Sequence, residues 1–310
     1  MNILITGGTG LIGRHLTALL LAEGHSVAHL TRGGGPGAPG VRTFCWNPAA
    51  HRLDPAAVAW AHGIVHLAGA GVMDARWTPA RKQEVVASRV GGLHLLRDAL
   101  ARGGHRVRVL VSASAIGIYG DRGDQWLTEN TPPPAPGAAG KSDFLADVCR
   151  QWEAAALQIR ATGLRVPIVR IGIVLSALGG ALPQMAQPVR LGAGAPLGTG
   201  RQWTSWIHAL DVARLLAAAL TDERYIGTYN AVAPNPVTNA DLTRAIARVL
   251  GRPLLLPPVP AFALRLLLGE RATAVLASQR VRPDAAAALG FEWRYAAVER
   301  ALAEALGGDA

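Results

Sequence analysis

Three glycines near the start of the chain, Gly7, Gly10 and Gly13, lie between an apolar stretch and an amphipathic one. Gly7 permits a tight turn, Gly10 removes a side chain where the backbone must approach a diphosphate, and Gly13 lets a helix pack closely on a strand. The N–H groups and dipole at the start of such a helix favour negative charge. The alternative is a strand-to-helix turn without a ligand. The residues predicted to contact the diphosphate are Gly7, Thr9, Gly10, Leu11, Ile12 and Gly13.

The second apolar stretch ends where dinucleotides are usually discriminated. It is followed by Arg32, and neither Asp nor Glu occurs between Ser26 and Arg52. Proteins that prefer NAD usually present a carboxylate here to the ribose hydroxyls, whereas a guanidinium fork suits a 2′-phosphate. Thr31 and Arg32 therefore predict NADP(H) as the cofactor. The alternative is that Arg32 is a solvated surface residue.

Short apolar stretches alternate with helical patterns through the first half of the chain. This alternation predicts an α/β fold with a Rossmann-like, doubly wound parallel sheet covered by helices on both faces. Ligands of such sheets bind at the carboxyl ends of the strands. The expected strands are residues 2–6, 26–31, 41–45, 63–67, 107–112 and 164–171, and the expected helices are residues 11–23, 79–101 and 143–161.

The pattern changes after Ile171. Residues 179–200 are rich in Gly and Pro and predict a loop with a short helix, and four prolines between 253 and 260 precede a helical remainder. A helix at 239–250 is expected to be capped by Thr238 or Asn239. The other expected elements are a helix at 211–220, a strand at 228–232 and a surface loop at 131–140.

These elements predict two structural units. The first is a Rossmann domain at residues 1–171, to which residues 205–235 return. The second is a smaller, mostly helical lobe that covers the substrate. It comprises residues 172–204 and 236–310 and includes a C-terminal helical domain at residues 253–302.

The composition excludes several classes of protein. Half of the 310 residues are hydrophobic and 17% are charged, which excludes general disorder. The net charge of +10 comes from 29 arginines and two lysines, scattered singly, so we expect no nucleic-acid partner. The only cysteines, Cys45 and Cys149, lie far apart, which favours a reducing cytoplasm. No apolar run approaches the roughly 18 residues of a membrane span, so we expect no membrane partner.

Further segments carry a resemblance to a known family. They are residues 30–32, 66–69, 112–120, 144–149, 170–175, 200–203 and 206–208, with Trp77, Lys82, Ser88, Arg89, Trp152, Glu153 and Asp211. With the glycine turn, they make the chain similar to the extended short-chain dehydrogenase/reductases, the NAD-dependent epimerase/dehydratase group. More narrowly, the chain resembles an atypical, epimerase-like subfamily. Residues 253–302 resemble the small C-terminal domain, DUF1731, found with that subfamily.

The resemblance implies roles for residues that follow three of the strands. Ser112 would approach the nicotinamide, and Arg170 would border the nicotinamide and the substrate cleft. A further segment would pass beneath the adenosine and the bridging phosphates, although its histidine could instead belong to the core. That segment is His66, Leu67, Ala68 and Gly69.

The catalytic pair of this superfamily is missing from the chain. Hydride transfer there relies on Tyr-x-x-x-Lys, in which the lysine lowers the tyrosine pKa so that the tyrosine exchanges a proton with the substrate. No tyrosine here is followed four residues later by lysine, and Phe144 and Val148 stand in the corresponding places. The acid pair of the dehydratases is replaced by Ile116 and Gly117. The resembling subfamily shares this departure.

Other side chains in segments expected to border the cleft could donate a proton. Tyr119 is either a donor or a structural turn residue. The spacing of His208 and Asp211 places both on one face at a helix start, where the carboxylate could orient the imidazole or the pair could be structural. The candidate catalytic residues are therefore His208, Tyr119 and Ser112, and the further alternatives are Cys149, Glu129 and Lys141.

The sequence thus favours an NADP(H)-binding oxidoreductase that acts on a small carbonyl or sugar-nucleotide-like substrate without the usual Tyr-x-x-x-Lys pair. The alternative, suggested by the missing pair, is a non-catalytic NADP(H) sensor that regulates a protein partner. We expect no metal site, because His62 and His66 flank a predicted strand. The substrate is not specified by these residues, and a homodimer, common in the superfamily, stays open.

Overall fold

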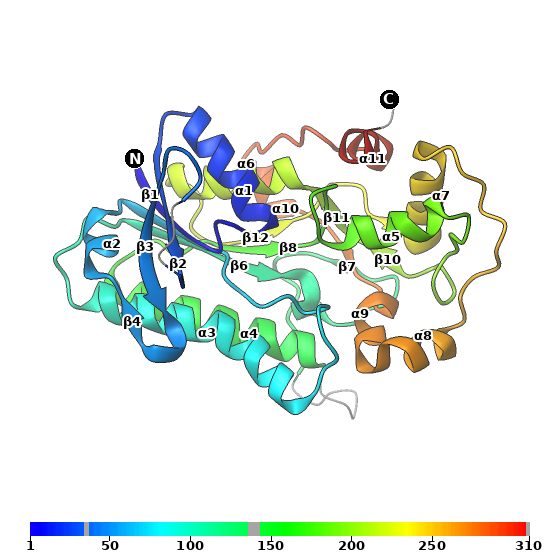
Figure 1. The fold of residues 1–310 in the computed structure, drawn as a ribbon, viewed down its shortest axis with the longest axis horizontal. Coiled ribbons are helices and arrows are strands. Elements are labelled where there is room, and N and C mark those ends of the chain that lie inside the picture. Colours follow the sequence, from blue (N-terminus) through cyan, green and yellow to red (C-terminus); the bar gives the residue numbers. More distant parts are fainter. Residues whose placement is uncertain (34–36, 136–142, 308–310) are drawn as a thin grey trace.

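A sheet of mostly parallel strands runs through the centre of the molecule. The computed structural model describes residues 1–33, 37–135 and 143–307 (Figure 1). In these ranges the main sheet has the strand order β12-β8-β6-β5-β1-β2-β3-β4, with β3 and β4 as its antiparallel pair. Its strands are β1 (Asn2–Thr6), β2 (Ser26–Thr31), β3 (Val41–Asn47), β4 (Arg52–Leu53), β5 (Gly63–His66), β6 (Val109–Ala115), β8 (Ile168–Ile171) and β12 (Thr228–Ala231).

The direction in which strands are added reverses between β1 and β5. From β1 the chain proceeds to β2 and β3 on one side, and it then returns to β5, β6, β8 and β12 on the other. This is the doubly wound order that the alternation predicted, so the Rossmann-like fold class is confirmed. Such a reversal leaves a crevice at the carboxyl ends of the two central strands, where ligands bind.

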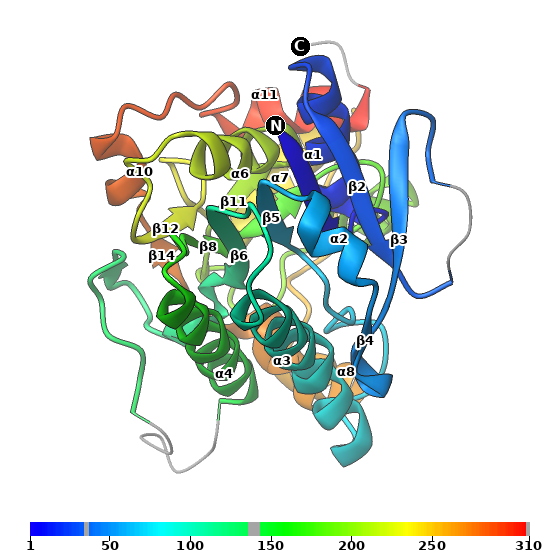
Figure 2. The same cartoon turned by 90° about the vertical axis from the view of Figure 1, so that its left-hand side faces the viewer.

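Helices cover both faces of this sheet. One face carries α1 (Leu11–Ala22) and α6 (Ala209–Thr221), and the other carries α3 (Pro79–Ala101) and α4 (Phe144–Gln158), which lie side by side in Figure 2. The short α2 (Pro55–Trp60) packs beside α3. Because both faces are covered, β1 is apolar without alternation, and Ile3, Leu4 and Ile5 are fully buried.

A second hydrophobic cluster lies beside the carboxyl ends of the sheet. It packs α5, α7 and α11 around the fully buried Leu175, Leu182 and Trp206. The helices beyond the main sheet are α5 (Ala181–Arg190), α7 (Asn239–Val249), α8 (Ala261–Leu268), α9 (Ala272–Leu276), α10 (Asp284–Ala288) and α11 (Val298–Leu306). The short paired strands are β9 (Ile173–Leu175) with β11 (Trp206–His208), β10 (Trp203–Thr204) with β13 (Val237–Thr238), and β7 (Trp126–Leu127) with β14 (Arg280–Val281).

Local sequence signals placed several boundaries correctly. The observed bounds of β1, β2 and α3 equal the predicted ones, and the Thr238 side chain caps α7 by accepting from Asp241 N. The helix predicted to reach residue 161 instead ends at Gln158 and tightens into the 3₁₀ turn Ile159–Thr162. The strand predicted at 164–171 is shorter, because Pro167 cannot donate to a neighbouring strand.

The described residues contain no helix that is both long enough and apolar enough to cross a bilayer. The predicted loop at 131–140 falls partly outside the described residues. The proposed division into a Rossmann domain and a substrate lobe stays a prediction.

Candidate functional site

The glycine turn joins β1 to α1 at the centre of the crevice. Gly7 has a φ of 69°, and a Cβ there would lie 2.9 Å from the backbone of Leu67 and Ala68. A Cβ on Gly13 would lie 2.3 Å from the Gly7 carbonyl oxygen. Both positions therefore require glycine, Gly7 for its left-handed conformation and Gly13 for the close approach of helix and turn.

The start of α1 is open to an anion. Gly10 is its N-cap residue, no side chain caps the helix, and its first turn contains no acidic residue. The first-turn N–H groups, which belong to Leu11, Ile12 and Gly13, have no carbonyl partner within a helix. An uncapped helix start behind a glycine turn fits a diphosphate.

Arg32 lies beside this turn. Leu30 of β2 pairs with Thr6 of β1, so Thr31 and Arg32 follow where the turn begins. The Arg32 side chain is exposed, and in the described ranges it forms no ion pair with an acidic residue. The Thr31 hydroxyl is buried and makes no hydrogen bond with the described residues. The arrangement suits a 2′-phosphate on the ribose next to the turn.

The segment after β5 is held against the turn by a buried threonine and histidine. The Thr6 hydroxyl accepts from Leu67 N and Ala68 N, both at 3.1 Å, and lies 2.9 Å from His66 Nδ1. His66 Nε2 donates to Arg89 O at 3.2 Å, since a carbonyl can only accept, so Nδ1 accepts the Thr6 proton. His66 is fully buried, and the structure thus places it in the core, where it anchors the segment leading to Gly69.

Burial of His66 makes a testable contribution to stability. Burial lowers its pKa from 6.5 to about 4, so the unfolded chain binds a proton that the folded chain does not. The contribution of His66 to the free energy of unfolding is therefore complete above pH 6.5 and is lost as the pH falls toward 4. From pH 7 to pH 5 we expect a loss of about 2 kcal/mol from this residue. Urea unfolding at both values measures it.

A His66→Gln variant isolates this effect from the other histidines. We expect its free energy of unfolding to change less between pH 7 and pH 5 than that of the unmodified protein, although it is less stable at pH 7. His51→Gln, at an exposed histidine, serves as the control. An unchanged pH dependence in His66→Gln would contradict the assignment.

A buried polar network lies where three strands meet α4. Ser114, Arg170 and Asn230 are aligned across β6, β8 and β12. Arg170 donates to both carboxylate oxygens of Glu153, at 2.8 and 2.9 Å, and Ser114 Oγ donates to the same carboxylate at 2.7 Å. Burial alone lowers the Arg170 pKa, but hydrogen bonds and charge from Glu153 outweigh it, so the net pKa is raised.

Tyr119 closes this network. Its hydroxyl accepts from Arg170 Nη1 at 2.9 Å and lies 2.8 Å from Asn230 Oδ1, to which it donates. Burial raises the Tyr119 pKa, so the hydroxyl keeps its proton. Ser112 is buried as well and donates to Ala113 O. The Tyr119 and Arg170 side chains are engaged within the protein, and a direct role for Ser112, Tyr119 or Arg170 in catalysis or cofactor binding stays a prediction.

The sequence predicted Asp211 as the carboxylate that orients His208, and this prediction is wrong. His208 Nε2 lies 2.6 Å from the carboxylate of Glu304 in α11, while its Nδ1 accepts from Leu210 N at the start of α6. Asp211 instead accepts from the backbone N–H groups of Arg294 and Tyr295 and from Arg214 Nη1. Both residues lie at the start of α6, as predicted, with His208 as its N-cap residue and Asp211 in its first turn. Residues 294–304 provide the carboxylate for His208 and two of the donors for Asp211.

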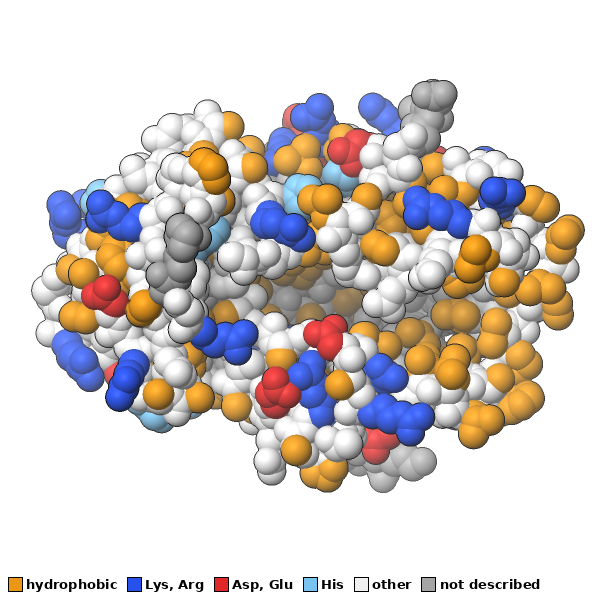
Figure 3. Space-filling view, viewed as in Figure 1, with side chains coloured by type: hydrophobic (Ala, Val, Ile, Leu, Met, Phe, Trp, Pro, Cys, Tyr) orange, Lys and Arg blue, Asp and Glu red, His pale blue; other side chains and the backbone are white. Residues whose placement is uncertain are grey.

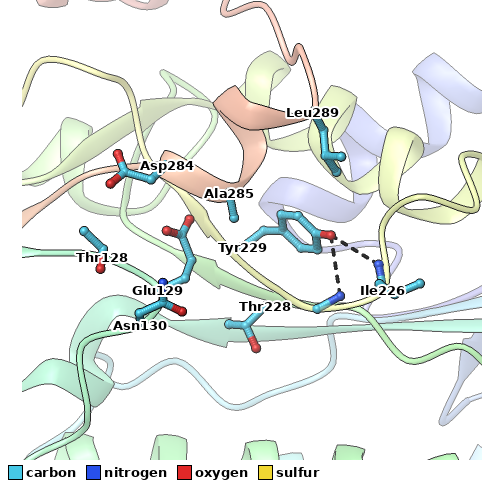
Figure 4. A pocket seen from close by; sticks show the side chains of 10 residues that line it. Thr128, Glu129, Asn130, Ile226, Thr228, Tyr229, Asp284, Ala285 and Leu289 are labelled. Atoms are coloured by element: carbon cyan, nitrogen blue, oxygen red, sulfur yellow. Dashed lines mark hydrogen bonds between the residues drawn. The ribbon is translucent and has the colours of Figure 1, made fainter.

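The remaining predicted donors are distributed over the molecule. Burial raises the pKa of Cys149 to about 12, so it stays a thiol. Glu129 faces a cavity of about 570 Å³ at the edge of the sheet (Figure 4) and accepts from Asn230 N at 2.9 Å. That cavity is lined by Thr228 at the amino end of β12, away from the ligand-binding ends of the strands. Lys141 lies outside the described residues.

A cluster that the sequence patterns did not connect surrounds Phe144, at the start of α4. The Trp77 ring packs against Phe144 with a centroid distance of 4.9 Å, and Lys82 Nζ lies 5.4 Å from the Phe144 centroid. Lys82 also forms a 2.5 Å ion pair with Glu270, which precedes α9. The ammonium thus lies beside the residue that stands in place of the family's tyrosine. Trp77 and Lys82 were singled out only as part of the resemblance.

The molecular surface is hollowed near this region. Figure 3 shows the hollow between the layer that holds α1 and α5 and the layer that holds α3, α4 and α9. In the described ranges no three His, Cys, Asp or Glu side chains gather as a metal-binding group would.

Comparison with known proteins identifies the family. The model of the NAD dependent epimerase/dehydratase family matches residues 3–232. The chain belongs to this family. A second model, a domain of unknown function (DUF1731), matches residues 259–305 of this family member. The resemblance inferred from the sequence motifs is therefore confirmed.

Relatives of this epimerase-family chain match nearly its whole length. An Arabidopsis thaliana protein named epimerase family protein SDR39U1 homolog, chloroplastic, is 39% identical over 97% of this chain and 86% of its own. Bacillus subtilis epimerase family protein YfhF is 35% identical over 98% and 97%. The crystal structure of human epimerase family protein SDR39U1 (isoform 2) with NADPH has a TM-score of 0.86, with 32% identity over 99% of both chains.

Proposed function

We propose that this chain binds NADP(H) in the crevice between β1 and β5 and uses it to reduce a small carbonyl or sugar-nucleotide-like substrate. The uncapped start of α1 behind Gly7 and Gly10 carries this proposal, because it fits a diphosphate. The exposed guanidinium of Arg32 supports the 2′-phosphate form. The human relative, whose structure is named as containing NADPH, supports the same cofactor.

The donor of the proton is the second part of the proposal. NADPH held at the glycine turn would supply a hydride for the carbonyl carbon of the substrate, whose oxygen would then need a proton. Lys82 holds an ammonium at the place where the family's tyrosine is replaced by Phe144. Its Nζ–H would donate to that oxygen, and Lys82 would recover the proton from water, since its side chain is 33% exposed. Glu270 fixes the position of the ammonium.

The composition of the chain supports a specific use of lysine at position 82. The sequence contains 29 arginines and two lysines, so arginine is its usual cation. Arginine is always charged and cannot give up a proton in a protein, whereas lysine can. A lysine beside the apolar Trp77 and Phe144 rings, positioned by its ion pair with Glu270, therefore suits proton donation in a way that an arginine would not.

Cofactor binding is tested by a matched pair of glycine substitutions. Gly13→Ala forces a Cβ against the Gly7 carbonyl and displaces the turn, so we expect the Kd for NADPH to rise about 10- to 100-fold. Gly91→Ala, in the middle of α3, would place its Cβ 3.9 Å from Pro48 Cβ, an ordinary van der Waals contact, and should leave the Kd unchanged. Isothermal titration calorimetry measures both. Absence of NADPH binding to the unmodified protein would refute the proposal.

The choice between NADPH and NADH is tested at Arg32. Arg32→Ala removes a charged hydrogen-bond donor to the 2′-phosphate, which is worth about 1.5–3 kcal/mol. We expect a loss of about 10- to 100-fold in NADPH affinity and no change in NADH affinity. Arg102→Ala, at another exposed arginine, is the control. Equal losses for the two coenzymes would show that Arg32 does not contact this phosphate.

Turnover distinguishes a reductase from a sensor. NADPH oxidation is followed with a panel of small aldehydes, ketones and nucleotide sugars. Binding of NADPH without its oxidation in the presence of any of these compounds would favour the sensor.

We also propose that the protein works in a reducing compartment such as the cytoplasm, which the unpaired Cys45 and Cys149 support.

A further inference from the structure

One end of the molecule exposes an apolar surface formed by α8 and the segment before it. We call the five residues Leu255, Leu256, Phe262, Leu266 and Leu267 the apolar patch. Leu255, Phe262 and Leu266 are 79%, 73% and 84% exposed. Figure 3 shows hydrophobic side chains gathered over α8 and that segment. A contiguous surface of this kind marks an interaction site.

The exposed face of α8 is apolar because of its sequence. Leu264 provides the buried contact of the helix and is 6% exposed. At 3.6 residues per turn, Phe262 and Leu266 lie one above the other on the opposite side, with Leu267 next to them. An ordinary surface helix would carry polar residues there. The face is therefore built to contact something apolar.

Charge around the apolar patch selects the partner. Residues 242–269 contain four arginines and no acidic residue. Arg252 and Arg265 are exposed, and neither forms an ion pair with an acidic side chain in the described ranges. A second copy related by a twofold axis would bring these like charges together. A bilayer with anionic lipids offers an apolar interior and a negative surface, which complement both features.

We propose that the apolar patch inserts into the surface of a bilayer that contains anionic lipids, with Arg252 and Arg265 at the headgroups. Such peripheral contact needs no membrane-spanning helix, and it revises the sequence-based expectation of no membrane partner. It does not depend on the reaction proposed above. The patch lies apart from the glycine turn, so cofactor binding and bilayer binding can be measured separately.

Vesicle sedimentation tests the proposal. We expect the full chain to bind phosphatidylcholine vesicles containing about one-third phosphatidylglycerol, and to bind pure phosphatidylcholine at least about tenfold more weakly. The double variant Phe262→Ser/Leu266→Ser should lose at least about tenfold of the binding. Arg252→Gln/Arg265→Gln should lose the preference for the anionic vesicles.

Two controls and a second measurement make the outcome decisive. Ile226→Ser removes another exposed apolar residue, 68% exposed, from the edge of the sheet. Arg102→Gln/Arg106→Gln removes the same charge beyond the end of α3. Neither should change vesicle binding, and thermal melts should show every variant folded. Failure of the unmodified protein to bind anionic vesicles overturns the proposal. A dimer in solution that Phe262→Ser/Leu266→Ser dissociates would instead assign the patch to a second copy.

Discussion

Replacing Lys82 by methionine is expected to lower kcat for NADPH-dependent carbonyl reduction by about 100- to 10,000-fold, the usual contribution of a general acid. Methionine keeps the length of the side chain and its contact with Phe144, but it carries no proton. The Kd for NADPH should stay the same, because Lys82 serves the substrate oxygen. Steady-state kinetics and calorimetry on the same preparation separate the two effects.

The other lysine of the chain, Lys141, was a further candidate donor, so its substitution decides between the two lysines. Lys141→Met should leave kcat unchanged. Lys82→Arg keeps the charge but cannot release a proton, so it should be nearly as impaired as Lys82→Met. Glu270→Gln should reduce kcat less, since it removes only the group that positions the ammonium. Full activity of Lys82→Met would eliminate Lys82 as the donor and leave the cofactor proposal intact.

Glu153→Gln is expected to destabilise the protein by about 3–5 kcal/mol, because it leaves the buried Arg170 without a counter-charge. Arg170 is 7% exposed and donates to both oxygens of the Glu153 carboxylate. A neutral amide can accept from one of these donors and adds N–H groups that compete with them. Urea unfolding at pH 7 measures the loss as a lower transition midpoint with an unchanged slope.

Two further variants show whether the loss of stability in Glu153→Gln comes from the unpaired charge of Arg170. Asp98→Asn breaks the exposed Arg97–Asp98 pair and should leave the midpoint unchanged, because solvent already screens those charges. The double variant Glu153→Gln/Arg170→Met removes both charges and should regain part of the stability lost in Glu153→Gln. Equal effects of Glu153→Gln and Asp98→Asn would show that the buried pair is dispensable.

Features that depend on residues close together in the sequence were predictable. The glycine turn is one of them, since backbone conformation and close packing at Gly7 and Gly13 are fixed within a few residues. The parallel sheet is another, because a strand that is buried on both faces, such as β1, has a continuous apolar sequence. The confirmed Thr238 cap of α7 belongs to the same class.

Contacts between distant segments were not predictable in the same way. Nothing near His208 in the sequence indicates that Glu304 provides its carboxylate, and the helical spacing to Asp211 pointed to the wrong residue. Lys82 and Glu270 are likewise joined only by the folded chain. Side-chain pairing across such separations depends on how distant segments pack together, which periodicity does not encode.

The buried Asp211 depends on hydrogen-bond donors that are synthesised long after it. This fully buried carboxylate takes two of its hydrogen bonds from the backbone of Arg294 and Tyr295. A ribosome must therefore add 83 residues after Asp211 before the first of these donors is synthesised. A nascent chain that stalls earlier would hold an incompletely satisfied charge beneath α6, and such premature products should be preferred substrates for cellular proteases.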